Sequence, residues 1–226
     1  MSTIAPTLAA VDAAAPPLAV RLRRWALIAM PVAAGALCIV ATVADPAPGV
    51  DGMGMYEAYT TGMEALQIKS FSFHWAYALW VLPALLVAAS VRGRGRLLAN
   101  IGAVLALFGL ATMPGMLMVD WIQSAIGQLY GAEAIGEVFD LVDQQAWALP
   151  LLRTPAILGL TFALPIATWA LVRARRARWW APVAAFLACA AFMLSAATLP
   201  GTIAAAVLLT IVAVELERAT RPGSGF

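Results

Sequence analysis

Charged residues are scarce in this sequence of 226 residues. Only 12% of the residues are Asp, Glu, Lys or Arg, whereas 63% are hydrophobic. Soluble domains average about 25% charged and about 45–50% apolar residues, so the composition argues against a water-soluble domain, a disordered chain and a nucleic-acid-binding protein. We therefore expect an integral membrane protein that lies in the lipid bilayer and has no nucleic-acid partner.

Residues that commonly bind metals or catalyse reactions are also rare. Cys38 and Cys189 lie far apart inside apolar runs, which predicts packing residues rather than a disulfide or a metal motif. His74 is the single histidine, so ligation of haem by two histidines is excluded. Glycine-rich phosphate loops and the Cys-x-x-Cys, His-Glu-x-x-His and Gly-x-Ser-x-Gly motifs are absent. We expect no cofactor and no resident metal.

A metal site formed by methionine side chains is one alternative to this expectation. Soft thioethers near one side of the membrane could bind cuprous copper together with His74. Methionine also fills irregular apolar gaps, and the spacing matches no copper motif, so packing is the favoured interpretation. The methionines concerned are Met53, Met55, Met63, Met113, Met116 and Met118.

Long apolar runs, by contrast, are abundant. A membrane-spanning helix requires about 20 mainly apolar residues, and the sequence predicts an all-α, polytopic bundle of about six such helices. They form one domain over residues 25–218, between a disordered tail at residues 1–24 and a second tail at residues 219–226. The predicted spans are residues 25–44, 73–91, 97–119, 147–172, 179–199 and 202–216.

The basic residues predict the orientation of the bundle. If six spans alternate in direction, all of the 14 basic residues except Lys69 and Arg153 fall on one side. The positive-inside rule places that side in the cytoplasm. We therefore expect a multi-pass protein of a bacterial cell membrane with both termini in the cytoplasm and most acidic residues outside.

The first apolar run has two interpretations. Arginines followed by an apolar run that ends at Ala44 are also typical of a secretory signal that is cleaved there. The run is as long as a full span, however, and exceeds the core of about 7–15 residues in such signals. We favour an uncleaved signal anchor.

Two hairpins share a sequence pattern. Each has Leu-Pro, then an arginine-rich turn at residues 92–96 or 173–178, then an apolar run that ends in Ala-Thr-Met-Pro-Gly or Ala-Thr-Leu-Pro-Gly. Parallel repeats in transporters often enclose a binding site. Proline and arginine-rich turns also recur without duplication, so both interpretations stay open.

The segment between the third and fourth spans is amphipathic. Apolar residues recur at helical spacing over residues 122–142, acidic residues line the opposite face, and Gly131 is expected to divide two short helices on the outer face. Residues 55–68 show a weaker version of the pattern. These segments either cover the outer mouth of the bundle as a lid or connect the spans at the interface, and we favour the connectors.

Arg153 is the charged residue that lies deepest within a predicted span. It follows Trp147, an interfacial anchor, by about 9 Å at 1.5 Å per residue. A charge at that depth requires a counter-ion, water or a path to the headgroups. Asp120 is the expected counter-ion, with the amides of Gln144 and Gln145 as further partners. Arg153 is therefore either a structural ion pair or a contact for a ligand.

Other candidate ligand-binding residues lie on the same predicted side of the membrane. His74 begins the second span beside Trp75, although a lone interfacial histidine is more often structural. Aromatic side chains would form the cavity wall, and acidic side chains would supply a proton. The remaining candidates are Trp121, Trp147, Glu57 and Glu64.

Three stretches carry a resemblance to other sequences. They are the Arg-Gly-Arg turn, the run Leu-Phe-Gly-Leu-Ala-Thr-Met-Pro-Gly followed by Val119 and Asp120, and the turn Arg-Ala-Arg-Arg-Ala-Arg-Trp-Trp. Over residues 73–199 the chain resembles a group of uncharacterised multi-pass membrane proteins from high-GC Gram-positive bacteria. The resemblance implies a membrane bundle and assigns no activity or site residue.

Two classes of function fit these features. The first is a non-enzymatic protein, either transporter-like, ligand-binding or complex-forming, that handles an apolar or amphiphilic small molecule. The second is a membrane-embedded enzyme of lyase, isomerase, cyclase or transferase type that acts on a lipid or isoprenoid, with Asp120, Glu57 or Glu64 as its acid. The enzyme hypothesis predicts an enclosed cavity into which a carboxylate side chain reaches.

Overall fold

The structure is a computed structural model that describes residues 17–117, 119–195 and 198–221. All regular secondary structure in these ranges is helical, which confirms the predicted all-α bundle. The helices are α1 (Leu18–Val43), α2 (Met53–Thr61), α3 (Met63–Ser90), α4 (Arg96–Leu117), α5 (Val119–Tyr130), α6 (Ala132–Gln145), α7 (Leu149–Arg173), α8 (Ala181–Leu194) and α9 (Leu199–Ala219).

Five helices in the described part of the chain are long and apolar enough to cross a membrane: α1, α3, α4, α7 and α9. The fifth predicted span, residues 179–199, contains the shorter helix α8. Its 14 residues extend about 21 Å, less than the bilayer core of about 30 Å. Apolar composition continues past Leu194, but the helix does not, because Ser195 ends it and Pro200 lies in the first turn of α9.

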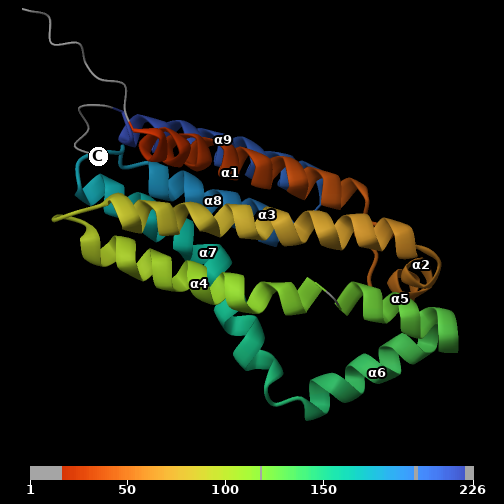
Figure 1. Cartoon of the computed structure of the whole chain (residues 1–226). Helices are drawn as coiled ribbons and strands as arrows, with labels where there is room; N and C mark the ends of the chain where they lie inside the picture. The colour runs from red at the N-terminus through yellow and green to blue at the C-terminus, as the bar shows by residue number, and fades with distance from the viewer. Residues whose placement is uncertain (1–16, 118, 196–197, 222–226) are drawn as a thin grey trace, which may run out of the picture.

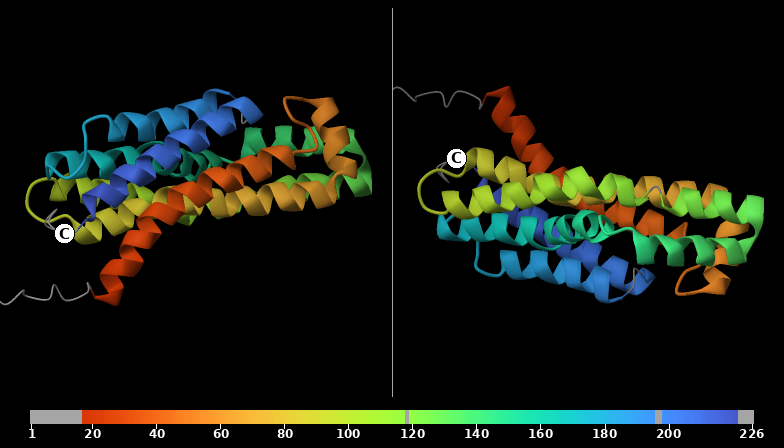
Figure 2. Two further views of the ribbon diagram at one scale, coloured as in Figure 1. Left: turned by 90° about the horizontal axis from the view of Figure 1, so that it is seen from above. Right: turned by 90° about the horizontal axis from the view of Figure 1, so that it is seen from below.

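The long helices run side by side, and the turns between them gather at two ends (Figure 1). One end holds the start of α1, the turns α3–α4 and α7–α8, and the end of α9. The other holds α2, α5 and α6 (Figure 2). The helices α1, α3, α4, α7, α8 and α9 thus alternate in direction, as expected for the six predicted segments. We call the second end the outer end, following the predicted orientation.

Several boundaries differ from the prediction. Helix α1 already begins at Leu18, so Arg21, Arg23 and Arg24 lie on a helix and not in a disordered tail; residues 1–16 lie outside the described part. Helix α3 begins at Met63, ten residues before the predicted span, because polar residues such as Lys69 can continue a helix beyond the apolar run. Gly131, at φ 93°, divides α5 from α6 as predicted.

Small residues bring the spans into close contact. Gly35 of α1 faces Ala206 of α9, and Gly109 of α4 faces Gly159 of α7; a Cβ atom added at Gly159 would lie 2.6 Å from the carbonyl oxygen of Leu105. Membrane helices pack through such small residues because lipid offers no hydrophobic driving force between helices. The α4–α7 pair therefore depends on a backbone-to-backbone approach.

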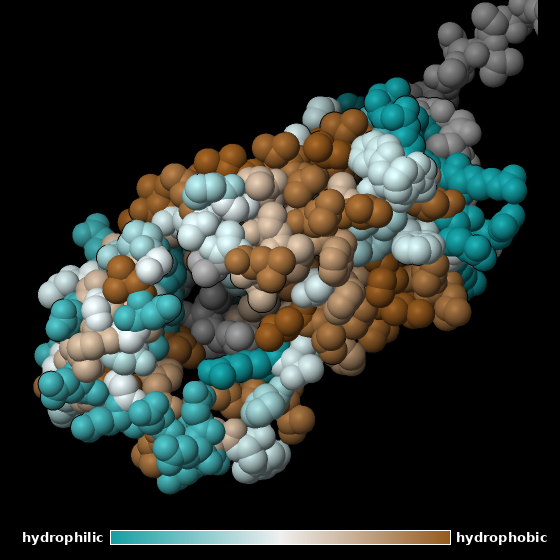
Figure 3. Space-filling model, turned by 180° about the vertical axis from the view of Figure 1, so that it is seen from behind, coloured by the Kyte–Doolittle hydropathy of each residue, from teal (hydrophilic) through white to brown (hydrophobic). Residues whose placement is uncertain are grey.

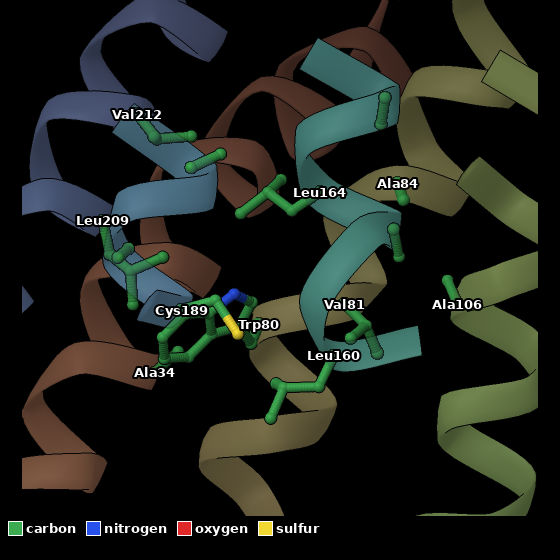
Figure 4. Packing of buried hydrophobic residues seen from close by; sticks show 14 of the residues in the cluster. Ala34, Trp80, Val81, Ala84, Ala106, Leu160, Leu164, Cys189, Leu209 and Val212 are labelled. Carbon is green, nitrogen blue, oxygen red and sulfur yellow. The ribbon is translucent and has the colours of Figure 1, made fainter. Parts of the chain in front are cut away.

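Larger side chains fill the centre of the bundle. Trp80 of α3, Leu164 of α7 and Cys189 of α8 point into the space between these helices (Figure 4). Outside this core, apolar side chains cover much of the middle of the face that Figure 3 shows, and hydrophilic side chains gather at both ends of that face. Large exposed apolar surfaces mark sites of contact with a membrane or another protein, which fits a membrane bundle.

The two arginine-rich turns have different backbone chemistry. Gly93 and Gly95 adopt positive φ values of 69° and 93° in the α3–α4 turn, whereas Arg175 adopts φ 60° after α7. A non-glycine residue in this region is strained by about 1–2 kcal/mol.

We expect Arg175→Gly to stabilise the protein by about 0.5–1 kcal/mol. Gly93 has open space around it, and we expect Gly93→Ala to destabilise the protein by a similar amount. Thermal unfolding in detergent measures both; a loss of stability in Arg175→Gly would contradict the expectation.

Candidate functional site

A buried ammonium group joins three segments at the outer end. Lys69 of α3 is only 9% exposed, and its Nζ lies 3.0 Å from Asp45 Oδ2 and 3.7 Å from Asp120 Oδ2. The same Nζ donates a hydrogen bond to the Tyr59 hydroxyl of α2. Lys69 thus connects the end of α1, helix α2 and the first turn of α5. We call Asp45, Tyr59, Lys69 and Asp120 the lysine cluster.

Local structure fixes the two carboxylates of the lysine cluster. The backbone N–H of Ala47 donates to Asp45 Oδ1 at 3.1 Å, which holds the turn after α1. The Ser70 hydroxyl donates to Asp120 Oδ2 at 3.1 Å. Asp120 also lies in the first turn of α5, where the helix dipole favours a negative charge.

The lysine cluster contains more acid than base. Two carboxylates share one ammonium group, so its formal charge is −1 when both acids are ionised. Burial raises the pKa of Asp120 above its usual value, although Lys69 and the Ser70 hydroxyl oppose this shift. Burial likewise raises the pKa of Tyr59. The cluster therefore has room for one further positive charge.

A cavity of about 430 Å³ lies beside the lysine cluster. Its volume and its mostly apolar wall with a few polar groups are typical of small-molecule sites. The polar groups are Tyr59, Thr112, Asp120, Gln123 and Arg153. The apolar wall consists of Met55, Ala111, Val119, Leu149 and Leu152. We call this the outer cavity.

A second, smaller cavity of about 120 Å³ lies between α3, α4 and α7. His74 lines it together with Tyr77, Met113 and Leu160. Leu160 follows Arg153 by seven residues, about 10 Å along α7. His74 therefore faces a different cavity from the one that Arg153 lines, and deeper in the bundle.

The prediction that Arg153 forms an ion pair with Asp120 is wrong. Arg153 Nη1 lies 3.7 Å from Asp143 Oδ1, and these side chains are 47% and 60% exposed. Asp120 instead contacts Lys69 and Ser70, because the additional turns of α3 bring Lys69 within reach of α5. Arg153 and Asp120 nevertheless line the same outer cavity. The structure thus places both residues in the wall of one cavity and pairs each of them with another residue.

Arg153 contributes little to stability in this arrangement. Exposed ion pairs contribute about 0–1 kcal/mol, and the side chains of Arg153 and Asp143 are both about half exposed. We expect Arg153→Ala to change the free energy of unfolding by less than about 1 kcal/mol. Thermal unfolding in detergent or nanodiscs measures this, with Lys69→Ala as the comparison. A loss as large as that of Lys69→Ala would show that Arg153 is desolvated.

The other predicted site residues contribute to neither cavity wall. Trp75 is 46% exposed and packs edge to face on His74, Trp121 is 39% exposed, and Trp147 is 81% exposed. Such exposed or half-exposed indoles near the outer end are typical of interfacial anchors. Glu57 and Glu64 are exposed. Three of the eight predicted site residues therefore line a cavity. Arg153 and Asp120 line the outer cavity, and His74 lines the smaller one.

The structure places two of the candidate methionines in different cavities. Met55 lines the outer cavity and Met113 lines the smaller one with His74. The side chains of Met116 and Met118 lie outside the described part. Across the described residues, no group of three His, Cys, Asp or Glu side chains is placed to hold a metal ion.

Sequence reasoning missed Lys69, Tyr59 and Gln123. A signal for Lys69 was present, because it is one of two basic residues on the acidic side of the membrane. Tyr59 and Gln123 carry no such signal, since they become neighbours of the cavity only when α2 and α5 pack together over the bundle.

The opposite end of the molecule carries separate ion pairs. Glu217 of α9 bonds Arg24 of α1 at 2.9 Å. Glu215, which is 1% exposed, accepts from the Arg218 guanidinium at 2.6 Å and from the Arg178 backbone N–H at 3.3 Å. These contacts tie α9 to α1 and to the α7–α8 turn, so we assign them a structural role.

No protein-family model, curated protein or solved structure matches this chain. Its function is therefore argued from the outer cavity and its charges.

Proposed function

We propose that the protein binds an amphiphilic molecule in the outer cavity without transforming it. The observation that carries this proposal is the wall of that cavity, where apolar side chains from α4 and α7 meet Arg153, Asp120 and Gln123. An apolar wall accommodates a chain or ring system, and a few polar groups orient a headgroup. A transporter-like protein or a ligand-binding subunit of a complex would both use such a site.

A photoactivatable amphiphile in proteoliposomes tests the proposal. Leu152 lines the outer cavity, whereas its neighbour Leu151 is 64% exposed and does not line it. We expect peptides from α4 and the start of α7 to be labelled, and we expect Leu152→Trp to reduce labelling at least tenfold by filling the cavity. Leu151→Trp is the matched control and should label as the wild type does. Equal labelling of both variants would overturn the proposal.

The alternative is an enzyme that acts on a lipid or isoprenoid. Asp120 favours it, because it is a carboxylate on the cavity wall whose pKa burial raises. Incubation of the purified protein with labelled bacterial lipids and isoprenoids, followed by chromatography, distinguishes the two. If the protein forms a product and Asp120→Asn abolishes product formation, the protein is an enzyme and the binding proposal is overturned. Recovery of unchanged lipid supports binding.

We further propose a bacterial plasma membrane location with both termini in the cytoplasm. The arginine-rich turns α3–α4 and α7–α8 lie at the same end as the described start of α1 and end of α9 (Figure 1), and the positive-inside rule places that end in the cytoplasm. Cysteine introduced at Gly52 should react with an impermeant maleimide in intact cells, and cysteine at Arg94 should not. Both native cysteines are buried, which keeps the background low. External labelling at Arg94 would reverse the orientation.

A further inference from the structure

The outer cavity carries opposite charges on walls from different helices. Asp120 belongs to α5 and Arg153 to α7. They do not pair with each other, because each has another partner: Lys69 for Asp120 and Asp143 for Arg153. The cavity therefore presents one acidic wall and one basic wall to whatever occupies it.

The acidic wall favours a positive charge. The lysine cluster behind it has one more carboxylate than it has ammonium groups. Tyr59 lines the cavity next to Asp120, and its ring already lies 4.8 Å from the Lys69 ammonium. A carboxylate beside an aromatic face is an arrangement that binds organic ammonium groups.

The basic wall favours a negative charge. The ion pair between Arg153 and Asp143 spans 3.7 Å, and both side chains are about half exposed, so this pair is weak. A guanidinium group has five N–H donors and forms bidentate contacts with phosphate or carboxylate. An anionic group in the cavity can therefore replace Asp143 as the partner of Arg153.

A third polar group lines the outer cavity. Gln123 of α5 is 9% exposed, and its amide is available to a ligand because it forms no hydrogen bond with any other described residue. An amide both donates and accepts, so Gln123 suits a headgroup that carries donors as well as acceptors.

We propose that the outer cavity accepts a zwitterionic headgroup, with its ammonium group at Asp120 and Tyr59 and its phosphate or carboxylate group at Arg153. This inference rests on the proposed amphiphile binding and specifies the ligand class. A purely anionic headgroup would face Asp120, and a purely cationic one would face Arg153. A zwitterion meets a complementary charge on each wall, and its apolar part lies against Leu149 and Leu152.

Native mass spectrometry of the delipidated protein tests the proposal with lipids of matched chains. The probes are phosphatidylethanolamine, anionic phosphatidylglycerol and a cationic trimethylammonium lipid. We expect phosphatidylethanolamine to bind at least tenfold more tightly than either of the others. Equal binding of all three would overturn the zwitterion and leave amphiphile binding intact, whereas no binding of any lipid would overturn the proposed function itself.

Variants assign each charge to its wall. Asp120→Asn should abolish the preference over phosphatidylglycerol and keep the preference over the cationic lipid, and Arg153→Gln should do the reverse. Gln123→Leu should weaken binding of phosphatidylethanolamine, and it leaves both charges of the cavity in place. This variant tests the site even if Asp120→Asn fails to fold. Glu133→Gln, at an exposed position of α6, is the matched control and should behave as the wild type. Parallel losses in Asp120→Asn and Arg153→Gln, without a change in preference, would overturn the assignment.

Two sources could supply this headgroup chemistry, a membrane lipid or a soluble zwitterion. Free phosphoethanolamine distinguishes them. Competition at concentrations similar to those of the lipid indicates a soluble ligand, and failure to compete indicates a lipid whose chains contribute to binding. Both outcomes keep the zwitterionic site, provided that phosphatidylethanolamine is preferred.

Discussion

Replacing Lys69 with methionine is expected to be among the most destabilising single changes in this protein. The side chain of Lys69 is 11% exposed, and those of Asp45 and Asp120 are each 21% exposed. Removal of the ammonium group leaves two partly desolvated carboxylates next to each other, and breaking a buried ion pair costs about 3–5 kcal/mol. We expect a loss of this size in thermal or denaturant unfolding of the protein in detergent or nanodiscs.

Two further variants separate this effect from the loss of a side chain. Arg153→Met removes a basic side chain of similar length from an exposed ion pair and should cost less than about 1 kcal/mol. The triple variant Lys69→Met, Asp45→Asn, Asp120→Asn removes the unbalanced charges and should recover most of the lost stability. If Lys69→Met were as mild as Arg153→Met, the lysine cluster would not be desolvated.

Gly159→Ala and Gly109→Ala are expected to have opposite effects, although the two glycines face each other across the α4–α7 contact. A Cβ atom at Gly159 would lie 2.6 Å from the Leu105 carbonyl oxygen and 2.7 Å from Gly109 Cα. One at Gly109 would approach Gly159 Cα only to 3.4 Å. The first substitution must separate two backbones, and the second makes an ordinary van der Waals contact.

We therefore expect Gly159→Ala to destabilise the protein by about 1–3 kcal/mol, as overpacking does, and Gly159→Leu to prevent folding. Gly109→Ala should be neutral or should stabilise by up to about 1 kcal/mol, because alanine favours a helix over glycine by about that amount. Unfolding midpoints of the two alanine variants give the comparison. Equal effects would show that α4 and α7 are not in backbone contact.

The apolar runs predicted the membrane bundle because insertion depends on the composition of about 20 consecutive residues. That property is local, so the sequence contains it directly. Turn chemistry is local as well: Gly131 divides α5 from α6 because glycine adopts φ 93° without strain. Helix ends were less predictable. Helix α3 begins before its apolar run because polar residues continue the helix, whereas α8 ends before its apolar run does.

The sequence by itself determined that this chain is a helical membrane bundle, that Arg153 and Asp120 lie near its outer end, and that Arg153 and Lys69 are the two basic residues on that side. Only the tertiary structure decided that Asp120 pairs with Lys69, that Arg153 pairs with Asp143, and that Gln123 lines the cavity between them. The physical reason is that an ion pair depends on the depth and rotation of two helices relative to each other. Periodicity defines the faces of each helix separately, and packing alone selects which faces meet.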